Sequence, residues 1–526
     1  MTLKVKDPVW IGVDVGTTGV RATAYTATGK AVATTEAFYS LETPQYDWAE
    51  QNPQQIYDAV EEVVKGTVAE LQYKLVTISG LALSSVMHSF IPQDDKFQLL
   101  GNMMTWADSR SAAIVRRLEK DPKVKDFYFN TGCPLHATYP LAKILWVKEN
   151  QPSIFERMTH IGSIKDFIFR NLTGEWVTDK SVASSSGLYN AHKECWDEEI
   201  LNFVGITEKC LPEVVSTTHS SALLPDVASR LGLPAGLPVV IGATDGVLVN
   251  VGIGAVSAGQ LSCTIGTSGA IRMLTEKPRM DKQQRTWCYN LTDDMWVAGG
   301  AINNGGIIMR WMRDRILHLH GPQMEQLDVD PYDLMTMKAR HVPAGSGGLL
   351  LMPFFTGERA PYWNSDLRGA FIGLSLNHSR SYMIRATMEG ICYSLLCVLQ
   401  ALRDFEEVKD IRVSGSFTKS ELWLQIMADI FNENITLPTN SEGASFGAAV
   451  LGFISDGTLK DIKDTATLVT AQEVYTPKEV NREVYDDLFK IYESLYVNMK
   501  DDLARLVKGC RLIKSSLPFK KAWVQP

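Results

Sequence analysis

The sequence has few cysteines and no excess of basic residues, and both absences exclude classes of protein. Its 526 residues include 8 cysteines, with no Cys-x-x-Cys pair. We therefore expect reduced thiols, as in cytoplasmic proteins, rather than a disulfide framework. The 60 acidic residues outnumber the 52 lysines and arginines, for a formal net charge of −8. A nucleic-acid-binding surface usually needs a basic excess, so that class of protein is disfavoured.

Long apolar runs and low-complexity segments are also missing. No apolar run approaches the roughly 18 residues that span a bilayer, and the opening residues MTLKVKDPVW lack the apolar core of a signal peptide. We expect a cytoplasmic protein with no membrane association. The composition, 45% hydrophobic and 21% charged, is typical of globular domains, and the length favours two or more of them.

The stretch VWIGVDVGTTGVRATAYT contains two strand-type runs, residues 9–15 and 20–26, joined by a Gly-Thr-Thr-Gly turn. Residues 29–39 continue as a third strand. Apolar residues recur at helical spacing over 52–71, with Asn52 placed to cap the helix. Residues 76–85 read as a buried strand, and the alternation of strands and helices predicts an α/β fold.

An internal echo indicates a duplicated domain. Residues 11–25 (IGVDVGTTGVRATAY) resemble residues 261–274 (LSCTIGTSGAIRML), and each copy places an arginine, Arg21 or Arg272, after the turn. Two such copies suggest two similar domains with a cleft between them, and residues 236–252 are the candidate crossover. The expected domains are 1–243, 244–490 and a C-terminal part, 491–526, that ends an amphipathic helix (484–506) and continues as a basic tail.

The Gly-Thr-Thr-Gly turn has the composition of a phosphate-binding loop. A tight hairpin points several backbone N–H groups into one concavity, and glycine lets the backbone approach a phosphate closely. Gly16, Thr17, Thr18 and Arg21 would supply donors and charge, although a plain hairpin turn has the same composition. The second copy, GTSG at 266–269, favours two hairpins that clamp a polyphosphate. No Gly-x-x-x-x-Gly-Lys-Ser/Thr loop occurs.

Two isolated acidic residues follow apolar runs. Asp14 lies inside a strand-type run, where a carboxylate is costly unless it is paired or coordinates a cation. Magnesium, bound through water, is the expected partner beside phosphates, and an Asp that caps its own turn is the alternative. Asp245 in VVIGATDGVLV is either a turn-forming Asp-Gly or a general base that accepts a proton from an attacking hydroxyl.

A third group of residues suits a polyhydroxylated ligand. His88, Trp106, Asp108 and Arg110 follow apolar segments and combine hydrogen-bonding groups, a ring face and a cation. The alternative is a set of surface-loop polar residues.

At these residues the chain resembles the FGGY carbohydrate kinases, over roughly residues 9–500. The resemblance rests on the joint order of DVGTTGVRA, WADSR, YPLAKILWVKEN (139–150), GATDG, GTSG, GGAINNGG (299–306), PFFTGERAPYWNSDLRGAFIGL (353–374) and VSGSFTKSELWLQIMADI (413–430). It implies two ribonuclease-H-like domains of the actin/Hsp70 type, with ATP and magnesium as cofactors.

The resemblance also implies residue roles. Asp14 corresponds to the magnesium-associated acid and Asp245 to the catalytic base. The phosphate loops contain Gly16, Thr17 and Thr18 in the first copy and Gly266 and Thr267 in the second. The nucleoside is expected at Gly306, Gly415 and Ser416. Sugar-side contacts are expected at His88, Trp106 and Asp108, with Arg110 close by.

Within the family, VMHSF, TWADSRSA and TGCPLHATYPLAKILW (131–146) look most like the gluconate kinases. Glycerol kinases carry Arg-Glu at Met87-His88, and xylulose kinases usually have Gly where Ser89 follows. We therefore expect phosphorylation of D-gluconate to 6-phosphogluconate, with a sugar acid and ATP as the small-molecule partners. A homodimer is compatible with the sequence.

Alternatives of other kinds remain open at this stage. They are an FGGY kinase for a pentulose or another sugar acid, a nucleotide-gated scaffold, and a noncatalytic sugar sensor. The carboxylate of a sugar acid has three candidate partners, Arg110, Lys165 and His136.

Four residues depart from the family pattern. Gly19 stands where serine is usual, and Ser416 where a second glycine is common. Thr138 and Tyr382 each break a usual residue choice.

Overall fold

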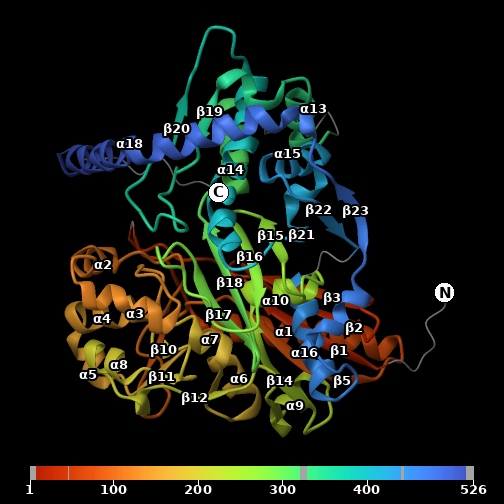
Figure 1. Cartoon of the computed structure of the whole chain (residues 1–526). Helices are drawn as coiled ribbons and strands as arrows, with labels where there is room; N and C mark the ends of the chain where they lie inside the picture. Colours follow the sequence, from red (N-terminus) through yellow and green to blue (C-terminus); the bar gives the residue numbers. More distant parts are fainter. Residues whose placement is uncertain (1–7, 46, 320–328, 440–442, 517–526) are drawn as a thin grey trace. The chain divides into compact units, whose positions relative to one another are not determined.

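The computed structural model describes residues 8–45, 47–319, 329–439 and 443–516, with side chains described up to residue 506. The chain divides into two compact units whose segments alternate along the sequence (Figure 1). Within the described residues, the first unit comprises Met1–Ser262, Arg272–Gly299 and Pro438–Gln472, and the second comprises Cys263–Ile271, Gly300–Leu437 and Glu473–Pro526. Asp14 and Asp245 both belong to the first unit. The domain boundaries expected at residues 243 and 490 stay predictions.

The first unit contains a mixed sheet of order β13-β14-β5-β1-β2-β3 (Figure 1). Its strands are β1 (Val9–Val15), β2 (Gly19–Thr26), β3 (Ala31–Phe38), β5 (Ile78–Ser85), β13 (Ser220–Ala222) and β14 (Pro238–Thr244). β1, β2 and β3 form an antiparallel meander, whereas β5 runs parallel to both β1 and β14. The carboxyl ends of β1, β5 and β14 therefore meet at one edge of the sheet.

Both faces of β1 are covered, which explains its nearly continuous apolar sequence. Val9, Ile11 and Val13 belong to the hydrophobic core that includes helix α1 (Pro53–Tyr73). Trp10 is also fully buried, and its Nε1 donates to Asp456 Oδ2 at 2.8 Å, just beyond helix α16 (Gly443–Ser455). α1 and α16 both pack against this sheet.

Helix α1 begins as the sequence predicts. The Asn52 side chain accepts a hydrogen bond from the Gln54 backbone N–H, and Pro53 occupies the first turn, where its missing N–H costs no hydrogen bond. The buried residues recur at helical spacing and include Ile56, Val60 and Val64. The predicted strands at 9–15, 20–26, 29–39 and 76–85 are confirmed with small changes of boundary.

The rest of the first unit consists of helices and short strand pairs. The helices are α2 (Ala112–Leu118), α3 (Pro122–Thr131), α4 (Pro140–Asn150), α5 (Pro152–Arg157), α6 (Ile164–Thr173), α7 (Lys180–Ser184), α8 (Glu198–Val204), η1 (Glu208–Cys210), α9 (Pro225–Leu231), α10 (Asp245–Gly252), η5 (Ile462–Asp464) and α17 (Thr465–Leu468). The strand pairs are β4 (Glu50–Gln51) with β7 (Met103–Met104), β6 (Ile91–Gln93) with β8 (His160–Gly162), β9 (Val177–Asp179) with β12 (Glu213–Val215), and β10 (Tyr189–Asn190) with β11 (Cys195–Trp196).

A second sheet has the order β17-β18-β16-β15-β21-β22-β23. Its strands are β15 (Gln260–Ile265), β16 (Gly269–Thr275), β17 (Trp287–Thr292), β18 (Met295–Ile302), β21 (Asp410–Ser414), β22 (Ile435–Pro438) and β23 (Ala471–Tyr475). β15 and β16 are neighbours joined by residues 266–268, so the second copy of the strand–turn–strand pattern is present as expected.

Helix α14 (Arg380–Arg403) forms the core of the second unit. It packs against α13 (Pro331–Arg340), α15 (Glu421–Phe431) and β19 (Leu350–Met352). By length and composition α14 would reach across a bilayer, yet 89% of its most apolar 18-residue window is buried inside the protein. It also carries a buried ion pair in which Arg385 Nε donates to Glu389 Oε1 at 2.8 Å. These features are typical of a core helix.

The remaining elements of the second unit are β20 (Ala370–Ile372), which pairs with β19, and the following helices: α11 (Gly306–Trp311), η2 (Met312–Ile316), η3 (Ala344–Gly348), η4 (Ser416–Lys419), η6 (Glu479–Asn481) and α18 (Arg482–Ser516). The helix predicted over 484–506 lies within α18. The basic tail ends outside the described residues.

Candidate active site

Two carboxylates lie at the carboxyl ends of β1 and β14, the two parallel strands that flank β5. Asp14 is opposite Ser84 in the β1–β5 register, and Ser84 Oγ donates to Asp14 Oδ1 at 2.7 Å. Asp245 directly follows Thr244, the last residue of β14, and starts helix α10. In open α/β sheets, this edge is where ligands bind.

The surroundings of Asp245 favour its protonated form. Partial burial, and next the negative charge of Asp14, raise its pKa to about 7, while the cations Arg272 and Lys165 and the Gly246 backbone N–H oppose the rise. Asp245 as a whole residue is still part-exposed. A carboxyl group with a pKa near neutrality is suited to accept a proton at physiological pH.

The same pair of acids fits a magnesium ion. Mg²⁺ usually binds through one or two carboxylates and completes its coordination with water and substrate phosphates. Asp14 could hold such an ion through water, and the cation would offset the Asp14 charge, which after burial is the second cause of the raised pKa of Asp245. No cluster of three or more His, Cys, Asp or Glu side chains suited to a metal occurs in the part of the chain that the structure describes.

The first turn, residues 16–18, is anchored to its neighbours. The Gly16 N–H donates to the Gly19 carbonyl at 2.9 Å, which closes the turn. Gln51 Nε2 donates to the Thr17 carbonyl at 2.8 Å, and Trp106 Nε1 donates to Thr17 Oγ1 at 2.9 Å. Thr18 at the tip is exposed. The Trp106 contact joins a residue expected on the sugar side to the expected phosphate loop.

Arg21 lies one strand away from Asp14 on the same face. The two residues are opposite each other in the β1–β2 register, and Arg21 is opposite Glu36 in the β2–β3 register. Arg21 Nη2 forms an ion pair with Glu36 Oε1 at 2.5 Å, and both side chains are about 40% exposed. The Arg21 guanidinium thus lies on the strand next to Asp14, but it is paired with Glu36.

His88 is held in an unusual backbone conformation just after β5. Its φ of +65° is in the left-handed region, which is uncommon for residues other than glycine. Its Nδ1 donates to the Ser185 carbonyl at 2.8 Å, and its ring packs edge-on against Tyr139 and Tyr289. The imidazole is therefore fixed in orientation.

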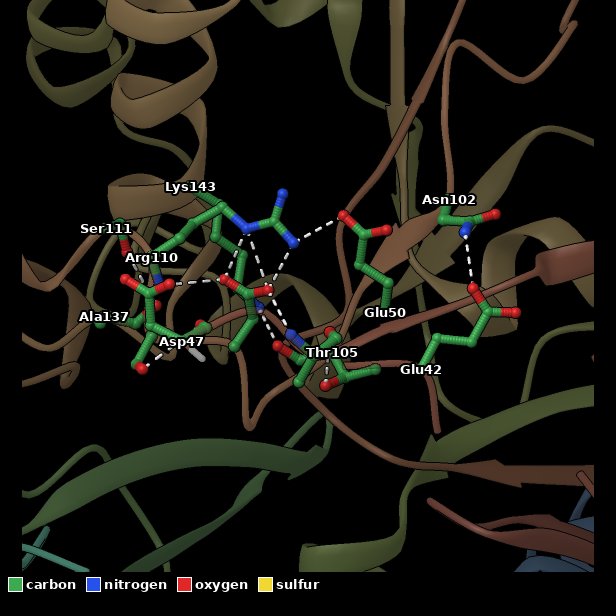
Figure 2. Close-up of polar contacts among 12 residues, drawn as sticks. Glu42, Asp47, Glu50, Asn102, Thr105, Arg110, Ser111, Ala137 and Lys143 are labelled. Carbon is green, nitrogen blue, oxygen red and sulfur yellow. Dashed lines mark hydrogen bonds and ion pairs between the residues drawn. The ribbon is translucent and has the colours of Figure 1, made fainter. Parts of the chain in front are cut away.

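Asp108 and Arg110 differ most from expectation. Their side chains are only 0% and 2% exposed, and they form an ion pair with Nη2–Oδ2 at 2.6 Å. Arg110 also binds Glu50 at 2.6 Å (Figure 2) and stacks 3.6 Å above the Trp48 ring. The Ala49 N–H donates to Asp108 Oδ2 at 2.7 Å. This arrangement orders a loop and leaves neither charge facing solvent.

In the second unit, the turn at 266–268 is fixed by the start of a helix. The Gly306 N–H donates to the Gly266 carbonyl at 2.7 Å, and the Ile307 N–H donates to the Thr267 carbonyl at 3.1 Å. Both donors belong to the first turn of α11. The structure thus brings Gly266, Thr267 and Gly306 together.

Gly415 lies against the residue that precedes this turn. Its φ of +101° strains any L-residue, and a Cβ there would lie 2.4 Å from the Ile265 carbonyl oxygen. Glycine is therefore required at this position. Ser416 is exposed and starts η4.

Residues 9–252 match the N-terminal domain of the FGGY family of carbohydrate kinases, and residues 261–455 match its C-terminal domain. The chain belongs to this family.

The gluconokinase of Bacillus subtilis (strain 168) is 38% identical over 493 residues, which cover 92% of this chain and 95% of that protein. The crystal structures of a gluconate kinase and of a ligand-bound xylulose kinase, both from Lactobacillus acidophilus, each superpose with a TM-score of 0.89 at 31% identity. Each superposition covers 95% of this chain and 100% of the other. The predicted family, its two-domain ribonuclease-H-like α/β fold and the resemblance to gluconate kinases are confirmed.

One departure from the FGGY pattern has a steric cause. A Cβ at Gly19 would lie 2.6 Å from the Ala37 carbonyl oxygen of β3. A serine at this position would force β2 and β3 apart. Another departure, Thr138, has a contact of its own, because its Oγ1 donates to the Trp106 carbonyl at 2.8 Å. Nothing in the structure explains Tyr382.

Three residues of this FGGY protein are candidate partners for the carboxylate of a sugar acid, and two of them are buried in ion pairs. Arg110 is paired as described above, and Lys165 Nζ lies 2.7 Å from Asp179 Oδ2, with 1% of its side chain exposed. His136 is part-exposed, and its Nδ1 accepts a hydrogen bond from the Thr138 N–H at 3.2 Å.

Sequence reasoning missed several polar groups beside the expected site. Glu358 is fully buried and accepts hydrogen bonds from the Asn303 N–H and Asn304 Nδ2, the residues just before the start of α11. Burial raises the pKa of Glu358 to about 7. Lys143 is fully buried as well. A sequence signal was present for Lys143, which is the one charged residue in the apolar run YPLAKILWV (139–147).

Proposed function

We propose that this protein is an ATP-dependent gluconate kinase that phosphorylates the terminal hydroxyl of D-gluconate to give 6-phospho-D-gluconate. The observation that carries the proposal is the pair of carboxylates, Asp14 and Asp245, at the carboxyl ends of the two parallel strands that flank β5, at the edge of the sheet where the turn at 16–18 follows β1. Membership of the FGGY family supports a sugar phosphotransferase, and the 38% identity to a gluconokinase supports the acceptor.

Asp245 acts as the general base in this proposal. It orients the terminal hydroxyl of gluconate and accepts its proton as the oxygen attacks the γ-phosphorus of ATP. The bond between the γ-phosphorus and the β,γ-bridging oxygen breaks, and ADP leaves with the electron pair of that bond. Arg272 and Lys165 keep enough of the Asp245 population ionised to act at neutral pH.

Each unit has a turn suited to phosphate through backbone N–H groups and hydroxyls. In the first unit we assign phosphate binding to residues 16–18, with Arg21 as a nearby cation. In the second unit we assign nucleotide binding to Gly266, Thr267, Gly306, Gly415 and Ser416. Magnesium, held at Asp14 through water, would neutralise the phosphate charge. Positioning and charge neutralisation then account for most of the rate.

His88 and Trp106 are the proposed sugar contacts. Both side chains are fixed by hydrogen bonds, and Trp106 also touches Thr17 of the first turn. Asp108 and Arg110 act indirectly by ordering the loop that carries Trp106. His136 is the proposed partner of the gluconate carboxylate, because it is the part-exposed member of the three candidates.

A panel of sugars and sugar acids in an ADP-release assay tests the proposal. Gluconate is expected to have the highest kcat/KM, by about 100-fold or more over xylulose. Equal use of xylulose would instead support a pentulose kinase, the second candidate, which the similarity to a xylulose kinase structure favours. ATP turnover that no sugar or sugar acid stimulates would contradict both.

A further inference from the structure

Lys143 is a buried lysine that the proposed reaction does not use. It lies in α4 with 0% of its surface exposed, between the buried apolar residues Ala142 and Ile144. Lysine is almost never fully buried unless its nitrogen is paired, because removing an ammonium from water is costly. Burial accordingly lowers its pKa to about 7, while Asp108 opposes this shift and Arg110 adds to it.

The Lys143 nitrogen binds two backbone carbonyls from separate segments. Nζ donates to the His88 carbonyl at 2.5 Å. It also donates to the Thr105 carbonyl at 2.8 Å, and Figure 2 labels both Lys143 and Thr105. These two segments are 17 residues apart in sequence, and each carries a proposed sugar contact: His88 itself and Trp106, the neighbour of Thr105. One side chain therefore joins the two parts of the proposed sugar site.

Both segments need such a tether. His88 has a φ of +65°, a conformation that a non-glycine residue keeps only when its surroundings hold it. The loop after Thr105 carries the Trp106 indole to Thr17 Oγ1. Thr138, five residues before Lys143, donates to the next carbonyl along, that of Trp106. The segment from Thr138 to Lys143 thus fixes two consecutive carbonyls of the loop.

We propose that Lys143 is a positioning residue of the sugar site, which holds the His88 and Thr105 carbonyls so that His88 and Trp106 face the acceptor together. The inference rests on the proposed function of His88 and Trp106 as sugar contacts. Lys143 acts through these residues and does not touch the substrate.

The test compares Lys143→Met with Lys148→Met. Lys148 is on the same helix, five residues further along, and also donates to a carbonyl, but that of Val204 at 3.1 Å, which belongs to neither segment. Lys143→Met leaves two buried carbonyls without their donor, and we expect KM for gluconate to rise about tenfold. KM for ATP is expected to rise less than about threefold. Lys148→Met should change both constants less than about twofold.

Equal increases of both KM values in Lys143→Met, or no change in either, would overturn the inference. Circular dichroism and a melting curve establish that the variant is folded. If Lys143→Met does not give folded protein, Lys143→Gln, which keeps an N–H donor in a neutral group, is measured in the same assays. Folded Lys143→Gln is expected to show a gluconate-specific rise in KM smaller than tenfold, and an unchanged KM for gluconate in this variant would contradict the proposal.

A double-mutant cycle with His88→Ala separates positioning from general loosening. When Lys143 acts partly through His88, Lys143→Met raises KM for gluconate by a smaller factor in the His88→Ala background than in the wild type. An identical factor in both backgrounds would overturn the inference. If His88→Ala alone leaves KM for gluconate unchanged, the assignment of His88 in the proposed function fails, which is a different result from a failure of Lys143.

Discussion

Asp245 and Asp108 are both carboxylates that follow buried segments of the first unit, yet their surroundings are opposite. Asp108 is fully buried between Arg110 and the Ala49 N–H, so its charge is satisfied within the protein. Asp245 is part-exposed, and its pKa is raised to about 7 by burial and by Asp14. The partners of a carboxylate, more than its position after a strand, separate a group available for chemistry from one that orders a loop.

The largest expected effect is on Asp245. Asp245→Asn keeps the shape of the side chain and removes the base, so kcat should fall about 10³-fold or more. The melting temperature should stay within a few degrees of the wild type, because the asparagine relieves the repulsion from Asp14. ADP release with gluconate, with nucleotide binding measured separately, checks this. A variant with normal turnover would show that Asp245 is not the base.

Asp108→Asn should lower stability more than it lowers kcat, the reverse of Asp245→Asn. Removing one charge of a buried ion pair leaves Arg110 partly uncompensated, and we expect a loss of about 3 kcal/mol in the free energy of unfolding. Chemical denaturation measures it. The control is Glu149→Gln, which breaks the exposed Arg117–Glu149 pair and should change the free energy of unfolding far less than Asp108→Asn does. Equal effects of the two substitutions would mean that the buried pair does not order the loop.

The pH dependence of kcat/KM distinguishes the two acids further. Asp245 must be ionised to accept a proton, and its raised pKa of about 7 means that protonation begins near neutrality. We expect kcat/KM for gluconate to fall about tenfold per pH unit below pH 7 and to level off above it. If kcat/KM instead falls only near pH 4, where an ordinary aspartate is protonated, the pKa of Asp245 is not raised and its surroundings do not differ from those of an ordinary carboxylate in this way.

The smallest expected effect concerns Arg21. Its ion pair with Glu36 is exposed, unlike the buried ion pair of Asp108. Arg21→Met should change the free energy of unfolding by less than about 1 kcal/mol. KM for ATP should rise about threefold if the guanidinium supports the phosphates beside the first turn. Glu36→Gln is the matched control and should leave KM for ATP unchanged. Similar KM values for ATP in both variants would show that Arg21 stabilises the sheet and does not contribute to ATP binding.

Much of the fold follows from local sequence pattern. The periods of the apolar residues predicted β1, β2, α1 and β5, and the repeated Gly-Thr-Thr/Ser-Gly turn predicted both hairpins. Asp14 and Asp245 were singled out because a lone acid after an apolar run is costly without a purpose. Their meeting at one sheet edge follows from the parallel pairing of β1, β5 and β14.

The parts that escaped prediction depend on partners distant in sequence. Arg110 was expected to face a ligand, but its partner Glu50 lies 60 residues away, and no local pattern indicates that pairing. The role of Lys143 depends on carbonyls 38 and 55 residues away, because backbone acceptors carry no sequence signal at all. The steric need for Gly19 arises from Ala37 on the neighbouring strand β3.

The most direct test of the central claim is phosphorus NMR of the reaction products. Wild-type protein with ATP, magnesium and gluconate should give ADP and a phosphate monoester on the terminal carbon of gluconate in equal amounts, and Asp245→Asn should give neither above background. Formation of ADP and inorganic phosphate without a phosphorylated sugar acid would contradict the account.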